Sequence, residues 1–286
     1  MSIKTNELQV LSNILPDDHF LVDSETKGTG RVAFSTIIPS NAAAHNAIYR
    51  GKNIQDKYID GSLYTAIENG TFEDLFIGDY FDITITTSLG GSETVRCMLA
   101  GFDVYWGCGD TAMFTHHAVI VPANCFATTA QMNAENVTTN GYTGSAMYTT
   151  VLPVYQTALE TVFGNRLLNN RELLTNAVTD GKSSGWAWFD CKLRLMSEAE
   201  VYGGNVWSSG YDVGIAKTQL PLFTLNPAKI VCGLGGANYA SNTARANWWL
   251  SAVTSAAYFA SVYYGGYAGS YAASSALGVR PRFLIS

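Results

Sequence analysis

The segment from Ala237 to Ala276 combines two kinds of residue that a folded chain uses for different purposes. Between Ser251 and Ala276, 22 of 26 residues are Tyr, Ala, Ser or Gly, a mixture that is unusual for a buried core. Tyrosine supplies rigid, amphipathic contact area at low entropic cost, and small residues supply fit, as in antibody loops. Between them stand large apolar residues typical of a rigid core: Trp248, Trp249, Leu250, Phe259 and Val262. The segment therefore predicts a binding surface carried by a rigid frame.

The composition of the whole chain limits its function class. With 286 residues, 47% of them hydrophobic, the chain can bury a sizeable core in two domains, or in one large domain with an appendage. Its formal net charge of -6 would repel a phosphate backbone, which argues against nucleic acid as a partner. No apolar run approaches about 18 residues, and the amino terminus lacks a secretory pattern. We therefore expect synthesis in the cytoplasm without membrane insertion.

The pattern of turns and alternating apolar residues predicts an α+β fold in two parts. Residues 1–48 are expected to form a small β-rich amino-terminal module for attachment or oligomerisation, ending in a linker over 39–46. Residues 49–286 are expected to form the main domain. Its predicted strands are 80–87, 93–104, 117–122, 248–250, 258–262 and 279–284. Its predicted helices are 153–164, which starts at a proline, and the capping box at 197–203.

Several motifs in order along the carboxyl-terminal part carry a family resemblance. They are Leu193-Arg194-Leu195-Met196-Ser197-Glu198, Val201-Tyr202-Gly203, Asn247-Trp248-Trp249-Leu250 and Gly278-Val279-Arg280-Pro281-Arg282-Phe283. Together they resemble the C-type lectin-like variable proteins of diversity-generating retroelements, which include phage tail tropism determinants. The resemblance covers residues 165–286 well, and more loosely the chain from about residue 70. It implies a C-type lectin-like domain of short helices and small twisted antiparallel sheets, with a variable region at about 237–285.

The resemblance has a consequence that can be checked in the sequence. In that family an error-prone reverse transcriptase rewrites adenines, so AAC codons become NNC codons, which cannot encode Lys, Glu, Gln, Met or Trp. The first four types supply 29 of the other 246 residues and none of the 40 from Ala237 to Ala276. Trp248 and Trp249 are the exceptions, and their codon contains no adenine. The pattern fits a diversified segment on a fixed frame, although a surface rich in glycine, serine and alanine would also lack those residues.

We expect the ligand to bind to exposed side chains of the variable region. The candidate ligand-binding residues are Asn238, Tyr239, Asn242, Tyr258, Tyr263, Tyr264, Tyr267, Ser270 and Tyr271. No cofactor or metal is expected, because the chain contains no Asp or Glu after Asp212 and a calcium site needs several hard oxygen ligands. Recognition of a cell-surface protein or glycan should therefore be independent of metal, and the chain is expected not to be an enzyme.

The amino-terminal module carries a shorter resemblance. Leu15-Pro16-Asp17-Asp18, the strand after it and Gly28-Thr29-Gly30 look like the attachment segments of phage tail fibre proteins. This resemblance implies that residues 1–48 dock on the particle while the main domain faces outward from the virion tail. The phage relatives also imply a homotrimer, and several copies on one particle would multiply a low affinity per site.

Two alternatives come from different classes of protein. Cys108, Asp110, His116 and His117 lie within ten residues and could serve a hydrolase, with a thiolate–imidazole pair at Cys108 and His116. Adjacent histidines on a strand would point to opposite faces, which argues against a shared metal ion. No cysteine follows Cys232, so the paired carboxyl-terminal cysteines of the formylglycine-generating enzymes are missing. The other alternative is a structural tail subunit whose tyrosines are covered by a neighbouring copy.

Overall fold

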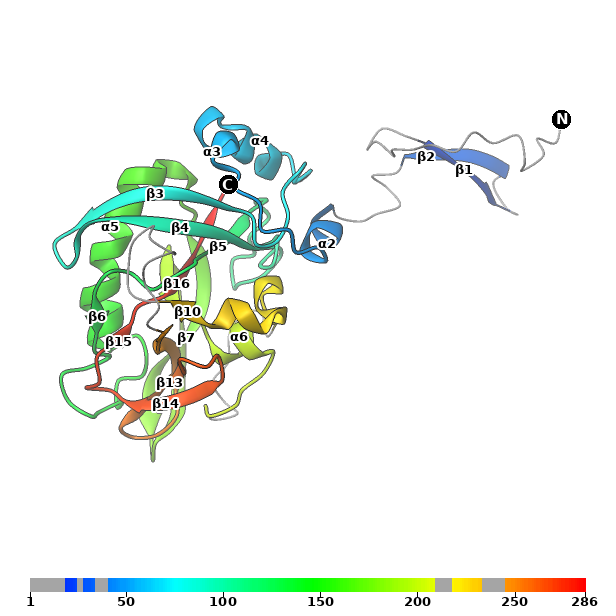
Figure 1. The fold of residues 1–286 in the computed structure, drawn as a ribbon. Helices are drawn as coiled ribbons and strands as arrows, with labels where there is room; N and C mark the ends of the chain where they lie inside the picture. The colour runs from blue at the N-terminus through cyan, green and yellow to red at the C-terminus, as the bar shows by residue number, and fades with distance from the viewer. Residues whose placement is uncertain (1–18, 25–27, 34–40, 209–217, 233–244) are drawn as a thin grey trace.

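The computed structural model describes residues 19–24, 28–33, 41–208, 218–232 and 245–286 (Figure 1). Antiparallel sheets dominate this α+β structure, and the helices are few and mostly short. The candidate residues Asn238, Tyr239 and Asn242 lie outside the described residues. Among the described residues, none of the helices is long and apolar enough to span a membrane.

The first five-stranded sheet has the order β3-β4-β5-β16-β9 and is antiparallel throughout. Its strands are β3 (Tyr80–Thr87), β4 (Gly91–Phe102), β5 (Ala118–Pro122), β9 (Leu193–Leu195) and β16 (Pro281–Ile285). Alternate residues of β3 are buried, whereas β5 and β16 are buried along their whole length. The last strand of the chain, β16, is therefore an interior strand of this sheet, between β5 and β9.

The second five-stranded sheet has the order β14-β13-β12-β15-β6. Its strands are β6 (Thr129–Ala130), β12 (Trp248–Val253), β13 (Tyr258–Val262), β14 (Ala268–Ala272) and β15 (Leu277–Gly278). Only the β12–β15 pairing is parallel. In Figure 1 the β13–β14 hairpin lies at the end of the main domain opposite α3 and α4. Since β14 is the last strand in this order, it forms an edge of the sheet.

Three smaller two-stranded sheets complete the strands. They are β1 (His19–Ser24) with β2 (Gly28–Ala33), β7 (Asn170–Thr179) with β8 (Lys182–Cys191), and β10 (Val231–Cys232) with β11 (Arg245–Ala246). The β7–β8 hairpin turns at Asp180 and Gly181, which both have positive φ, of 52° and 73°. Asp-Gly is a favoured pair for a two-residue hairpin turn. This sequence signal was present, but the hairpin was not predicted.

The helices pack around these sheets. They are α2 (Asn41–Asn46), α3 (Gln55–Asp60), α4 (Ser62–Glu68), α5 (Leu152–Phe163) and α6 (Glu198–Tyr202), with a π-helical turn at Met147–Val151 before α5 and three short 3-10 turns at Gly164–Arg166, Pro221–Thr224 and Asn226–Lys229. Both predicted helices are confirmed. Ser197 and Glu200 form the reciprocal capping box, and α6 ends at Gly203.

The predicted linker over 39–46 is wrong for residues 41–46, which form α2 and pack on the main domain. The Asn46 amide donates a hydrogen bond to the Phe102 carbonyl and accepts one from the Phe102 N–H, at 2.9 and 2.7 Å. The His45 ring lies among Phe72, Phe76 and Phe102. A run of alanines between polar residues is compatible with a helix as well as with a linker. The contacts of His45 with aromatic residues distant in the sequence favour the helix, and local sequence could not reveal them.

The two adjacent tryptophans of β12 point to opposite faces of the second sheet, and both are fully buried. The Trp248 indole N–H donates to the Lys229 carbonyl at 3.1 Å, and the Trp249 indole N–H donates to the Ala130 carbonyl at 2.8 Å. The segment before the tyrosines is therefore fixed from both sides by large side chains whose polar atoms are satisfied.

His117 is buried as a neutral imidazole with its proton on Nδ1. Its Nδ1–H donates to the Thr115 carbonyl at 2.9 Å, while Nε2 accepts the Tyr105 N–H at 3.1 Å. A proton on Nε2 would remove the second bond. Burial lowers the pKa of His117, and the nearby Arg282 charge lowers it further.

We expect the protein to lose stability as the pH falls below about 6.5, the ordinary histidine pKa, because the unfolded chain then binds more protons than the native one. Thermal unfolding of the parent and of H117Q between about pH 5.5 and 7.5 checks this. H117Q should be less stable overall, yet its melting temperature should depend less steeply on pH. Parallel curves for the two proteins would contradict the assignment.

Candidate functional site

Four of the predicted tyrosines gather at one end of the β13–β14 hairpin. Tyr263, Tyr264, Tyr267 and Tyr271 are here called the tyrosine cluster. The ring centroid of Tyr263 lies 4.4 Å from that of Tyr264, 4.8 Å from Tyr267 and 6.2 Å from Tyr271. Tyr264 and Tyr267 are exposed at 47% and 57%, while Tyr263 and Tyr271 are half-buried. The cluster is therefore a continuous aromatic surface with its two outer rings open to solvent.

The backbone turn that brings these rings together follows from the local sequence. The Gly266 N–H donates to the Tyr263 carbonyl at 2.7 Å, and the Tyr263 N–H donates to the Tyr267 carbonyl at 2.8 Å. Gly266 has a φ of 88°, a conformation that a residue with a side chain rarely adopts. The Gly265-Gly266 pair thus allows the tight return that stacks Tyr263 against Tyr267.

Asn247, just before β12, connects the cluster to the frame. Its amide nitrogen donates to the Tyr271 hydroxyl at 3.0 Å, and its amide oxygen accepts the Tyr264 N–H at 2.7 Å. Partial burial and the neighbouring Tyr263 raise the pKa of Tyr271, and the pKa of Tyr267 is raised in the same way. Both phenols therefore stay neutral at physiological pH.

The other described candidates lie apart from the tyrosine cluster. Tyr258 is 44% exposed but starts β13, five residues before Tyr263, which is about 16 Å along a strand. Ser270 alternates with Tyr271 on β14 and so points to the other face, where its hydroxyl bonds that of Thr254 at 2.6 Å. Of the six described candidates, four thus form one surface.

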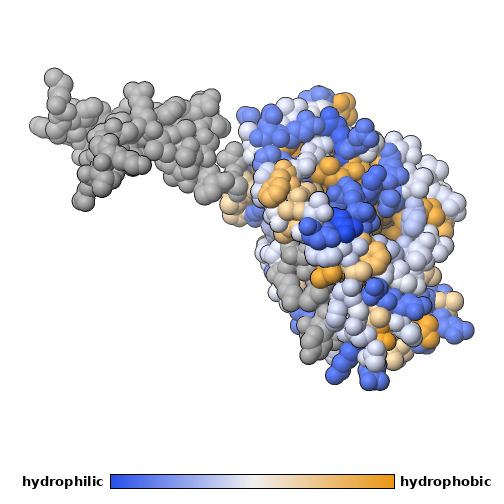
Figure 2. Space-filling view, turned by 180° about the vertical axis from the view of Figure 1, so that it is seen from behind, coloured by the Kyte–Doolittle hydropathy of each residue, from blue (hydrophilic) through white to orange (hydrophobic). Residues whose placement is uncertain are grey.

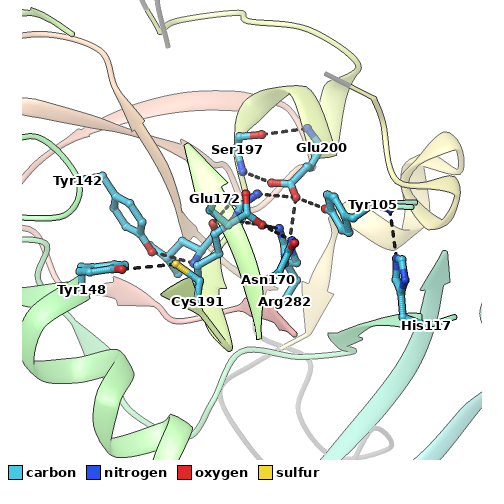
Figure 3. A network of polar contacts seen from close by, with 12 residues as sticks. Tyr105, His117, Tyr142, Tyr148, Asn170, Glu172, Cys191, Ser197, Glu200 and Arg282 are labelled. Carbon is cyan, nitrogen blue, oxygen red and sulfur yellow. Dashed lines mark hydrogen bonds and ion pairs between the residues drawn. The ribbon is translucent and has the colours of Figure 1, made fainter. Parts of the chain in front are cut away.

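The frame also contains a buried group of four charged residues, of which Glu172, Glu200 and Arg282 are labelled in Figure 3. Arg194 of β9, Arg282 of β16, Glu172 of β7 and Glu200 of α6 are all at most 3% exposed. Arg194 Nη2 lies 2.8 Å and Arg282 Nε 3.1 Å from Glu200 Oε1, and both arginines also pair with Glu172. The Tyr105 hydroxyl donates to Glu200 as well. We call these four residues the charge quartet.

The charge quartet balances two positive against two negative charges in the interior. Burial alone would raise the pKa of Glu200, but Arg194 and Arg282 hold it down to about 2. The Arg282 guanidinium also lies over the Tyr105 ring, 4.3 Å from its centroid. Because removal of one partner leaves an uncompensated buried charge, each member is required by the others.

The last motif of the chain continues the frame. The Arg280 guanidinium lies 4.9 Å from the Trp248 ring centroid and donates to the carbonyls of Pro122 and Ala228, at 2.7 and 2.9 Å. At Gly278 a Cβ atom would come within 2.4 Å of the Cys125 sulfur, so a side chain cannot be accommodated without a shift. The motif residues therefore serve packing between the two large sheets.

The segment from Cys108 to His117 does not assemble a thiolate–imidazole pair. His116 Nδ1 donates to Asp103 Oδ2 at 2.7 Å and lines a cavity of about 470 Å³, together with Trp106 and residues of α2. Cys108 is not among the residues lining this cavity, and burial raises its pKa, which is the opposite of an activated thiol. Within the described ranges no group of three or more His, Cys, Asp or Glu could hold a metal ion.

The remaining members of that segment are also occupied elsewhere. Asp110 forms two hydrogen bonds with Arg171, at 2.9 and 2.7 Å. His117 is buried against Tyr105 and is not among the residues that line the cavity beside His116. The expectation that the adjacent histidines point to opposite faces assumed a strand from Thr115, but β5 begins at Ala118, and the Nδ1 atoms of His116 and His117 lie 2.7 and 3.7 Å from the two carboxylate oxygens of Asp103.

Sequence reasoning missed two exposed apolar residues beside the tyrosine cluster, Val206 and Trp207, which are 55% and 57% exposed. The Trp207 indole N–H donates to the carbonyl of Ala268, the residue after Tyr267. A large apolar pair in a loop of Gly, Asn and Ser was the available signal. Exposed apolar residues elsewhere are scattered among polar ones on the face shown in Figure 2.

We expect E200Q to reduce the free energy of unfolding by about 3–5 kcal/mol, because it leaves a net positive charge buried with Arg194 and Arg282. Glutamine still suits the capping box, so the effect reports the charge. The control E160Q removes the half-exposed pair with Lys192, of 3.0 Å, and should cost less than about 1 kcal/mol. Denaturant unfolding measures both, and equal losses would contradict the role of the quartet.

Comparison with known proteins gives no assignment for this chain. No protein-family profile matches the sequence, and searches of curated proteins and of solved structures find no significant match. The functional argument therefore depends on the geometry of the tyrosine cluster and its frame.

Proposed function

We propose that this chain is a non-enzymatic recognition protein that binds a cell-surface protein or glycan through the tyrosine cluster. The observation that carries the proposal is the division of the structure into an aromatic surface and a frame with its own core. Tyr264 and Tyr267 are about half exposed, whereas the tryptophans of β12 and the charge quartet are buried. Exposed tyrosines on a rigid support are typical anchors of binding surfaces.

We further propose that the main domain is C-type lectin-like and belongs with the variable proteins of diversity-generating retroelements. The positions of the motif residues support this proposal. Arg194 and Arg282 belong to the charge quartet, and Arg280 packs on Trp248, so these residues stabilise the frame. The segment between the last two motifs carries the tyrosine cluster. A frame of this kind leaves the hairpin side chains free to vary without loss of the core.

The same proposal places the protein on a phage tail, where it would act in host tropism. The part of residues 1–48 that precedes α2 would attach to a particle component, and β1 and β2, paired from His19↔Ala33 to Ser24↔Gly28, would form part of that module. A homotrimer would present several tyrosine clusters at once. Avidity of this kind raises the overall affinity by orders of magnitude without new contacts.

We expect the triple variant Y263A/Y264A/Y267A to fold but to lose binding. The full chain, labelled with a fluorophore, is measured by flow cytometry against a panel of bacterial strains. Loss of the three rings should reduce binding at least about tenfold, since anchors of this kind contribute about 1–4 kcal/mol each. The melting temperature should fall by less than about 5 °C.

The control for this experiment is F114A, which removes an aromatic residue that is 67% exposed but lies outside the tyrosine cluster. It should leave binding unchanged. A collapse of stability in the triple variant would place these rings in the core, and unchanged binding would exclude the cluster as the recognition site.

Binding should also be nearly independent of salt. The tyrosine cluster contains no acidic or basic residue, and the raised pKa values of Tyr267 and Tyr271 keep these two phenols neutral at physiological pH. Association driven by charge weakens steeply as salt screens it, whereas contact between uncharged surfaces does not. For the strains that the full chain binds, we expect its apparent dissociation constant to change less than about threefold between 50 and 500 mM NaCl. A tenfold loss would show that charged residues outside the cluster dominate recognition.

A further inference from the structure

Trp207 lies beside the tyrosine cluster but outside the variable region. It lies in the loop that follows α6, and the residue before it, Val206, is also exposed. A single exposed indole needs no explanation, but the Trp207 ring, 57% exposed, adds to the exposed aromatic surface of the tyrosine cluster, and contiguous apolar surface of this kind marks interaction sites. Two sets of contacts nevertheless hold this ring in one place.

The first set comes from Glu198, whose side chain is almost completely buried. Its carboxylate accepts hydrogen bonds from the backbone N–H groups of Val206, Trp207 and Ser208, at 3.0, 3.0 and 2.9 Å, and from the Ser208 hydroxyl at 2.7 Å. Successive N–H groups converging on one anion form a rigid concave turn. Glu198 therefore fixes the backbone from which Trp207 projects.

The second set lies at the side of the β13–β14 hairpin where no strand of the described residues pairs with β14. The Trp207 indole N–H donates to the Ala268 carbonyl at 3.1 Å, and the Tyr202 hydroxyl donates to the Gly266 carbonyl at 3.2 Å. In an antiparallel pair, hydrogen-bonded and non-hydrogen-bonded residue pairs alternate. Because Tyr263 and Tyr267 are hydrogen-bonded, the next pair, Val262 and Ala268, is not, and the Ala268 carbonyl points away from β13. The Trp207 indole thus covers the first outward-facing carbonyl of β14, one of those that an extended peptide would need for strand addition, while Tyr202 holds the turn before the strand at Gly266.

We propose that Trp207 is a fixed member of the recognition surface, and that this surface meets an uncharged patch of its partner through ring faces rather than by strand addition. The inference rests on the proposed function. With the indole N–H engaged by Ala268, the exposed ring face remains for the ligand. Glu198 acts as a positioning residue, because it holds the loop and does not itself reach the surface.

The test uses the full chain on the strains that the parent binds in flow cytometry. W207A should weaken binding at least tenfold, whereas W207F, which keeps an aromatic face but loses the N–H donor, should stay within about threefold of the parent. The matched control W106A removes a tryptophan that is 42% exposed and stacks on His116, so it should leave binding unchanged. Retained binding by W207A would overturn the inference.

Glu198 is tested through a double-mutant cycle. E198Q should weaken binding, because the glutamine amide group cannot accept the hydrogen bonds that both carboxylate oxygens accept. If Glu198 acts through Trp207, E198Q/W207A should bind within about twofold of W207A alone. Additive losses would instead assign Glu198 a general structural role and overturn its part of the inference.

The outcomes separate this inference from the proposed function. If the parent binds, Y263A/Y264A/Y267A does not and W207A still does, only the role of Trp207 is overturned. Absence of parent binding to every strain overturns the recognition function and this inference with it. A W207F variant that binds as poorly as W207A would show that the edge contact with Ala268, and not the ring face, is what the ligand requires.

Discussion

The charge quartet is the interaction on which the rest of the structure depends. Glu172, Arg194, Glu200 and Arg282 come from four separate elements, β7, β9, α6 and β16, and each charge is balanced only when all four elements are in place. Apolar packing tolerates shifts between similar arrangements, but a buried charge without its partner costs several kcal/mol. The quartet therefore fixes the relative positions of α6 and the carboxyl-terminal strand, between which the segment that carries the tyrosine cluster runs.

This arrangement separates the stability of the domain from the identity of its surface residues. The tyrosine cluster is attached to the frame through Asn247, through the β13–β14 pairing and through Trp207 and Tyr202 at the strand edge. No member of the charge quartet makes any of these contacts itself, although Tyr202 belongs to α6, which the quartet holds in position. A protein built in this way can change its aromatic surface with a small cost in folding free energy, which is what a recognition protein under selection for new ligands requires.

Much of the fold could be predicted from the sequence because the signals were local. The alternation of apolar and polar residues around a glycine turn predicts the β3–β4 hairpin, and a short apolar run predicts β13. The proline in the first turn predicts the start of α5. β14 could not be predicted, since Ala268-Gly269-Ser270-Tyr271-Ala272 has low strand propensity and is extended through its pairing with β13. For the site, all nine candidates were expected to share one surface, which holds for Tyr263, Tyr264, Tyr267 and Tyr271 and is wrong for Tyr258 and Ser270, because their positions depend on the register of β13 and β14. Trp207 was missed because it reaches the cluster only through contacts 61 residues away in the chain.

Asn247 holds the hairpin by two bonds of different kinds. Its contact with Tyr271 needs a hydroxyl at that position, whereas its contact with residue 264 uses the backbone N–H and persists with any side chain there except proline. One half of this clamp is thus indifferent to substitution. The loop geometry at 264 can be inherited unchanged by descendants that present a different residue to the outside.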